Sequence, residues 1–129
     1  MRNFIYFIIF GFLLLNSCEK GPFNYRNKYL GEWGFIVKTT EINTDSIGYY
    51  HKESFTYSGE IKYGESNNEI IIEYLDNRSI TLSIDEDGVL SEFPTKYCGG
   101  KFDGEEKINL YLKWGGLGGG VTHVIEGKR

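Results

Sequence analysis

Two cysteines and two histidines are the side chains of this 129-residue chain best suited to nucleophilic or metal chemistry. A catalytic cysteine needs a nearby base that removes its proton, and His51 and His123 are the candidates for Cys98. Nothing in the local sequence places either histidine beside Cys98. The histidines are also too isolated for zinc, which normally has at least two closely spaced ligands. We therefore expect no catalytic residue and no metal ligand, and we interpret Cys98 as a buried thiol.

Three further segments have compositions that bind ions in other proteins. The glycine run at residues 115–120 lacks the Lys-Ser/Thr ending and the following helix of a phosphate loop, because a strand pattern begins at Val121. It favours a bent hairpin, although small residues also let a ligand or partner approach the backbone closely. The acidic segments 85–88 and 103–106 do not continue into a calcium loop and are typical of turns. No cofactor is expected.

Cys18 ends a segment that has the order of an export signal. Arg2 is positively charged, residues 4–15 are apolar without interruption, and the small residue Ser17 immediately precedes Cys18. Twelve apolar residues rise about 18 Å as a helix, which is short of the roughly 30 Å hydrocarbon core. The pattern therefore predicts a cleaved signal rather than a permanent membrane span.

This segment resembles the lipobox of bacterial lipoproteins, with Leu15 at the apolar position, Ser17 before the cleavage site and Cys18 as the acylated residue. The resemblance implies diacylation of the Cys18 sulfur with chains such as palmitate, cleavage before Cys18 and N-acylation. Two or more chains anchor a protein stably. Glu19 differs from the aspartate of an inner-membrane retention signal, which favours the outer membrane of the bacterial cell envelope. The membrane is then a partner through the N-terminal acyl chains.

Three segments follow from this interpretation. Residues 1–17 are the signal peptide, residues 18–28 are a lipidated tether with Gly and Pro and no clear period, and residues 29–129 are one β domain. Loss of Arg2 with the signal lowers the net charge from −4 to −5. An acidic chain without a Lys/Arg cluster is not expected to bind nucleic acid. With Cys18 acylated, Cys98 has no partner for a disulfide.

The mature chain alternates apolar and polar residues with a period of two, which predicts strands. No stretch of ten or more residues shows a helical stripe. The expected strands are residues 33–38, 55–63, 70–74, 80–84, 89–93, 97–102, 108–114 and 121–125.

Short polar links connect these strands. Asn67-Asn68, Asp76-Asn77, Asp87-Gly88 and Asp103-Gly104 provide residues that reverse the chain easily. Links this short require antiparallel neighbours. We therefore predict an all-β fold, an antiparallel up-and-down meander of about eight strands that closes, or nearly closes, into a small barrel and so removes its edges.

The segment Tyr29-Leu30-Gly31-Glu32-Trp33 is similar to the Gly-x-Trp opening of the lipocalin and wider calycin families. In those families the Trp plugs one end of a small barrel. The resemblance covers these five residues directly and, through the strand count, extends loosely over residues 29–129. It implies a lipocalin-like barrel, but the other lipocalin signature segments have no clear match.

Two functions fit such a domain, and neither is enzymatic. The first is a lipid-anchored binding module that holds a small apolar or amphipathic ligand, since an eight-stranded barrel has room for side chains or one small ligand. The second is an envelope protein that binds another protein, as scaffold or inhibitor, through its loops or outer face. The expected core or pocket residues are Trp33, Phe35, Tyr57, Ile61, Leu110 and Trp114.

Overall fold

Eight antiparallel strands close into a barrel, which confirms the predicted fold class. The computed structural model describes residues 24–43, 49–92, 97–116 and 119–129, so Cys18 and the predicted signal peptide lie outside the described residues. No helix in these ranges has the length and apolar character needed to cross a membrane. In chain order the elements are the 3₁₀ helix η1 (Tyr25–Tyr29) and the strands β1 (Gly31–Asn43), β2 (Tyr49–Tyr63), β3 (Glu69–Leu75), β4 (Arg78–Ile84), β5 (Val89–Ser91), β6 (Gly99–Asp103), β7 (Lys107–Gly116) and β8 (Gly119–Lys128).

Each strand pairs with its neighbour in sequence, and β8 returns to pair with β1 over ten residues, from Gly34 opposite Lys128 to Asn43 opposite Gly119. Three of the predicted turns contain the positive φ angles that their residue types tolerate: Asn77 at 56°, Gly88 at 79° and Gly104 at 65°. Local turn chemistry therefore determines the order of the strands.

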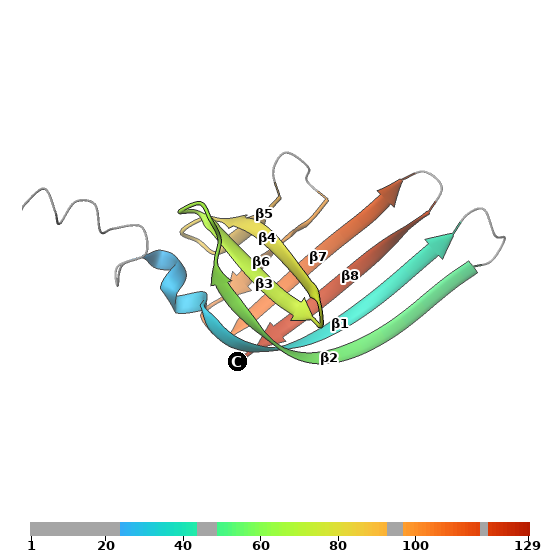
Figure 1. Ribbon diagram of the computed structural model, residues 1–129, viewed down its shortest axis with the longest axis horizontal. Coiled ribbons are helices and arrows are strands. Elements are labelled where there is room, and N and C mark those ends of the chain that lie inside the picture. The colour runs from blue at the N-terminus through green and yellow to red at the C-terminus, as the bar shows by residue number, and fades with distance from the viewer. Residues whose placement is uncertain (1–23, 44–48, 93–96, 117–118) are drawn as a thin grey trace, which may run out of the picture.

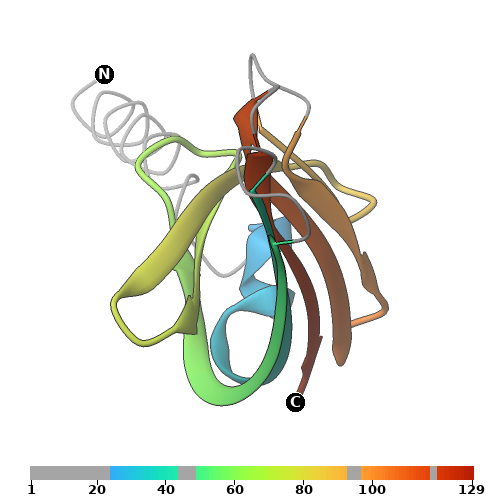
Figure 2. The same ribbon diagram turned by 90° about the vertical axis from the view of Figure 1, so that its right-hand side faces the viewer.

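The strands differ greatly in length, and this gives the barrel two unlike ends. β2 pairs with β3 only from Glu60 to Tyr63, and β6 pairs with β7 only as far as Tyr111. Beyond these points β2, β1, β8 and β7 continue side by side as a four-stranded extension, which we call the ribbon (Figure 1). Figure 2 looks into the barrel from the ribbon end, with η1 at the far end. We call these the open end and the closed end.

The barrel interior is filled by the apolar residues of each alternating pattern. In β1, for example, Trp33, Phe35 and Val37 are buried while Glu32, Gly34 and Ile36 are exposed. All strand pairings and the whole described hydrophobic core lie between Tyr25 and Lys128. The described residues therefore share one barrel and one hydrophobic core.

Two arginines seal the closed end. Arg26 is fully buried, and its Nη1 donates to the carbonyl oxygens of Ser66 and Glu69, both at 2.9 Å. Arg129 donates from Nη1 to the Leu30 carbonyl at 2.8 Å, and its guanidinium lies 5.0 Å from the centre of the Trp33 ring. Arg26, a residue of the predicted tether, thus packs within the fold, where its guanidinium joins η1 to the β2–β3 connection and lies 4.6 Å from the centre of the Tyr63 ring.

Gly59 marks the point where β2 leaves β3. A Cβ atom at this position would lie 1.8 Å from the carbonyl oxygen of Glu73, so no larger residue fits without moving one strand. The absence of a side chain lets β3 approach β2 closely before the two strands separate. From there β2 continues alone beside β1 into the ribbon.

Candidate functional site

Two exposed aromatic side chains lie at the open end, on the side of the ribbon that continues the barrel interior. Cross-strand pairs share a face, so the register places Thr39, Phe55, His123 and Trp114 on the side of the ribbon that continues the barrel interior. We call this side the inner ribbon face. Phe55 is 40% exposed and Trp114 is 39% exposed. Two aromatic rings therefore contact water directly above a filled core.

A buried polar pair lies beneath these rings. The Tyr74 hydroxyl on β3 is 3.2 Å from Nδ1 of His123 on β8, and both side chains are buried. The Trp114 ring meets the imidazole edge-on, with ring centres 4.9 Å apart. Burial, and then the charge of Arg78, lowers the pKa of His123. The imidazole is therefore held neutral, and burial also raises the pKa of the Tyr74 hydroxyl.

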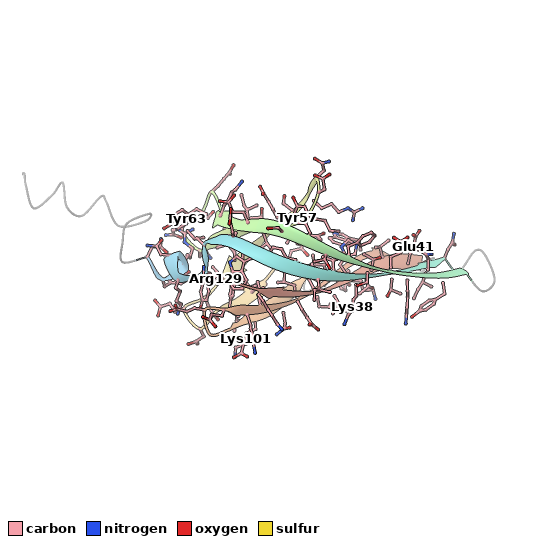
Figure 3. The ribbon with its side chains drawn as sticks, turned by 90° about the horizontal axis from the view of Figure 1, so that it is seen from below. Lys38, Glu41, Tyr57, Tyr63, Lys101 and Arg129 are labelled. Atoms are coloured by element: carbon pink, nitrogen blue, oxygen red, sulfur yellow. The ribbon has the colours of Figure 1, made fainter. Side chains whose placement is uncertain are left out.

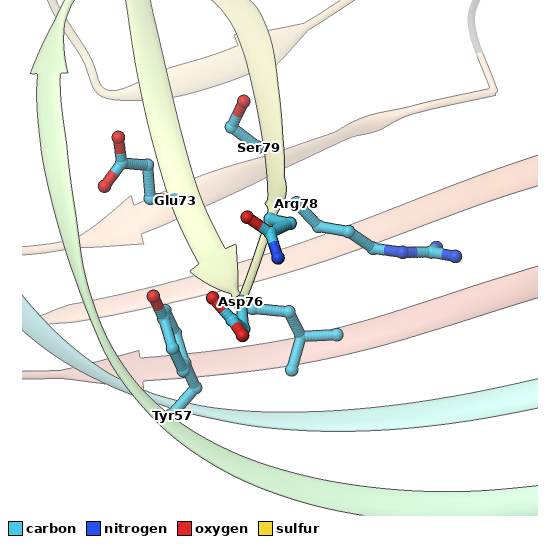
Figure 4. A pocket seen from close by; sticks show the side chains of 7 residues that line it. Tyr57, Glu73, Asp76, Arg78 and Ser79 are labelled. Atoms are coloured by element: carbon cyan, nitrogen blue, oxygen red, sulfur yellow. The ribbon is translucent and has the colours of Figure 1, made fainter.

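Arg78 brings a positive charge to the same end. It begins β4 just after the β3–β4 turn, and its side chain is exposed. Its charge opposes the effect of burial on the pKa of the Tyr74 hydroxyl. Beside Arg78, a pocket of about 400 Å³ lies between β2 and the β3–β4 hairpin. Figure 4 shows Tyr57 of β2 directed toward the hairpin that carries Asp76 and Arg78. The remaining lining residues are Glu73, Leu75, Asn77 and Ser79.

Cys98 also lies near the open end, but its environment opposes reactivity. The thiol is buried and lies 3.8 Å from the backbone carbonyl oxygen of Lys113. Burial raises the pKa of Cys98 above its ordinary value, whereas a nucleophilic cysteine needs a lowered one. Among the described residues, no group of three His, Cys, Asp or Glu side chains is placed to hold a metal ion.

The glycine run lies at the tip of the ribbon. Gly119 has φ +140°, and a Cβ atom there would lie 2.4 Å from the carbonyl oxygen of Ile42 on β1. Gly119 therefore lets β8 approach β1 closely. The hairpin that the sequence favours is the pairing of β7 with β8, in which Gly116 lies opposite Gly119 and Gly115 opposite Gly120. An open pocket of about 320 Å³ adjoins them, lined by Glu41, Ile42, Asn43, Gly116, Gly119, Gly120 and Val121.

The structure separates the six predicted core or pocket residues into two groups. Four of them are buried side chains of the barrel core: Trp33, Phe35, Ile61 and Leu110. The other two lie toward the open end, where Tyr57 lines the pocket beside the β3–β4 hairpin and Trp114 belongs to the inner ribbon face. The predicted set therefore divides into core residues and residues that water can reach.

The chain was compared with protein-family models, with curated proteins and with solved structures. Nothing matched. The residues of the site are two exposed aromatic rings, a buried histidine beside a tyrosine hydroxyl, and an exposed arginine. Such a combination can bind an apolar group and an adjacent polar or anionic group without bond making or breaking.

Three residues of this site escape sequence reasoning. His123 and Tyr74 are separated by 49 residues, and only barrel closure brings β3 and β8 to face each other. Arg78 reads in the sequence as an ordinary turn charge. One sequence feature points to the site. Phe55 begins the alternating run of residues 55–63, and with Tyr57 it lies on the inner ribbon face.

Proposed function

We propose that this chain is a lipid-anchored protein of the bacterial envelope that binds a small amphipathic ligand at its open end, without catalysis. The lipobox resemblance around Cys18 supports the anchoring, as argued from the sequence. η1, which contains the last residues of the proposed tether, lies at the closed end of the barrel, opposite the open end (Figure 1).

The exposure of Phe55 and Trp114 is the observation that carries the ligand proposal. Aromatic rings of this size are usually buried in a small barrel, and water contact at both is unfavourable unless a ligand covers them. Arg78 lies at the rim near the same inner face. An acyl or other apolar group on the two rings would place an anionic or polar head within reach of the guanidinium.

The neighbouring titratable groups favour binding over catalysis. Cys98 has a raised pKa, and His123 is buried with its Nδ1 facing the Tyr74 hydroxyl. Neither is arranged as a nucleophile with its base. We therefore propose that Tyr74 and His123 shape the floor of the site.

Tryptophan fluorescence provides a direct test, because Trp33 is buried in the core and Trp114 is exposed at the site. The chain from residue 18 onward, with Cys18→Ser to keep it free of acyl chains, is titrated with a lysophospholipid and with a neutral detergent of equal chain length. We expect saturable changes in Trp114 emission, which Trp114→Phe removes. Native mass spectrometry of the purified protein tests for a co-purifying lipid.

Two variants locate the ligand. Phe55→Ser should weaken both amphiphiles, whereas Arg78→Gln should weaken only the one with an anionic head. Lys62→Gln is the matched control, since Lys62 lies between Glu60 and Glu73 on the outer surface. Unchanged affinity in both Phe55→Ser and Arg78→Gln would contradict the proposed site.

A second candidate function, protein binding, rests on the free edge of β2. Residues 49–59 pair with β1 but have no strand partner on their other side within the described chain. Such an edge can accept an extended peptide as an added strand, and the pocket containing Tyr57 lies beside it. Proline at Thr56 or Ser54 removes a backbone donor from this edge and should abolish capture of an envelope protein in a pull-down. Ser91→Pro, on the paired strand β5, is the control for loss of the fold.

A further inference from the structure

The outer side of the ribbon holds most of the exposed apolar side chains. The register places on it Ile36, Lys38, Thr40 and Ile42 of β1, Tyr50, Lys52, Ser54 and Thr56 of β2, Tyr111 and Lys113 of β7, and Thr122, Val124 and Glu126 of β8. We call these residues the outer ribbon face. Nine large hydrophobic residues of the described chain are well exposed, and five of them belong to this face: Ile36, Ile42, Tyr50, Tyr111 and Val124. Such a concentration marks an interaction surface.

The charges on this face are mainly positive. Lys38, Lys52 and Lys113 belong to it, against a single acidic residue, Glu126, which pairs with Ile36. Glu126 lies 3.9 Å from Lys38, at the barrel end of the face, and offsets one of the three positive charges. The inner ribbon face carries the opposite sign, because Glu41 and Glu53 lie on it. Figure 3 shows Lys38 and Lys101 on one side of the molecule and Glu41 with Tyr57 on the other.

This separation of charge is notable in a chain whose net charge is −4. An acidic protein gains no general attraction to anionic surfaces, so an attraction must come from a local concentration of lysines. The lysines lie among tyrosines and aliphatic residues, so apolar contacts add to the electrostatic attraction. Lys52 Nζ lies 4.9 Å from the Tyr50 ring centre, so the ammonium stays at the level of the aromatic surface.

We propose that the outer ribbon face binds the surface of an anionic phospholipid bilayer. Lysines attract phosphate head groups, while tyrosine and aliphatic side chains enter the interfacial layer, as on an amphipathic helix. A four-stranded sheet presents these residues on one continuous face. The inference rests on the proposed envelope location but not on the ligand site, which lies on the opposite face and remains accessible when the outer face is occupied.

Vesicle co-sedimentation measures this binding without the acyl anchor. The Cys18→Ser chain from residue 18 is mixed with vesicles of phosphatidylcholine containing increasing fractions of phosphatidylglycerol. Partitioning should rise with the phosphatidylglycerol fraction and fall with added salt. Each of Lys38→Gln, Lys52→Gln and Lys113→Gln should lower the partition coefficient about fivefold, and the triple variant about a hundredfold. Lys62→Gln, which removes the same charge elsewhere, should bind like the wild type.

Quenching by brominated lipids measures the orientation. Tyr50→Trp places a reporter on the outer ribbon face, whereas Trp33 is buried and Trp114 lies on the inner face. Vesicles with bromine near the head group should quench the added tryptophan and leave the native emission unchanged. The Tyr50→Trp chain with Lys52→Gln and Lys113→Gln should lose this quenching.

Three results would overturn the proposal. One is the absence of binding to phosphatidylglycerol vesicles at low salt. Another is equal loss of binding in Lys62→Gln and Lys52→Gln. The third is dimerisation in sedimentation velocity that Lys52→Gln and Lys113→Gln abolish, since the face would then bind a second copy of the chain. Failure of lysophospholipid to bind at Trp114 would leave this proposal intact, because that site is on the other face.

Discussion

The Tyr74 hydroxyl and Nδ1 of His123 lie 3.2 Å apart beneath the open end, and both side chains are almost completely buried. Burial is the main reason why the pKa of His123 is lowered, and the charge of Arg78 acts in the same direction. The folded protein therefore binds a proton at His123 less readily than the unfolded chain does. This difference connects the stability of the barrel to pH.

Stability should fall as the pH drops through about 6.5, the ordinary pKa of histidine. Above this value His123 is neutral in both the folded and the unfolded state, and its contribution to the free energy of unfolding is complete. Below this value the unfolded chain takes up a proton first. The contribution is therefore lost as the pH falls toward the lowered pKa of the folded state. The free energy of unfolding should decrease by up to about 1.4 kcal/mol per pH unit. Urea unfolding at a series of pH values measures the slope. His123→Leu should flatten it between pH 7 and 5, whereas His51→Gln, at an exposed site, should not.

Arg129 should stabilise the closed end although it is the last residue of the sequence. Arg129→Ala removes its donors to the Leu30 and Lys28 carbonyls and its contact with the Trp33 ring. We expect a loss of about 1 kcal/mol in the free energy of unfolding, with greater quenching of Trp33 by acrylamide. Lys128→Ala, next to it and also exposed, is the control. Equal effects of the two variants would show that the cap contributes nothing specific.

Gly59→Ala should be among the most destabilising small substitutions in the barrel. The added methyl group meets the Glu73 carbonyl oxygen at 1.8 Å, and this oxygen belongs to the backbone of β3 and cannot rotate away. Overpacking of this kind costs about 1–3 kcal/mol. The control is Gly34→Ala, where the nearest atom is 3.6 Å away, at normal contact distance. Thermal unfolding of the two variants should separate them clearly, and equal melting temperatures would contradict the close approach.

Cys18→Ala should block lipid attachment and the linked cleavage after Ser17. The proposed signal keeps Arg2 and its apolar segment in this variant, so we expect export to begin and the precursor to accumulate in the inner membrane, held by residues 4–15 alone. Labelling with a clickable fatty acid and the intact mass of the wild-type protein check this. A wild-type protein without acyl mass, or an alanine variant that labels equally well, would remove the basis for the envelope location.

The fold could be predicted from the sequence wherever one strand face is apolar and the other polar. Alternation over residues 33–38 and 108–114, with the turns at Asn77, Gly88 and Gly104, is sufficient for an eight-stranded meander. The ribbon could not be predicted in this way. Where β2 begins, His51, Lys52 and Glu53 are all exposed, because both faces of the ribbon contact water and no alternation is needed.

The candidate site was only partly predictable for a related reason. Trp114 and Tyr57 stand out by type, but their separation from the core residues Trp33 and Phe35 depends on where β3 and β6 stop pairing. The partnership of Tyr74 with His123 depends on closure of the barrel, which brings together strands distant in sequence. Arg26 is part of a polar segment in the sequence, and its burial depends on partners distant in sequence, the carbonyls of Ser66 and Glu69 and the ring of Tyr63.

The pairing of β1 with β8 affects the order in which this barrel can fold. The contacts from Gly34–Lys128 to Asn43–Gly119 join residues 76 to 94 positions apart, so they form only after β8 has been synthesised. Arg129, which bonds the carbonyl oxygens of Lys28 and Leu30 just before β1, follows β8. Such distant contacts form slowly, and a nascent barrel lacking β8 keeps β1 incompletely paired. Closure of the barrel is therefore a late step, and until β8 is added the edge of β1 is open to pairing with other strands.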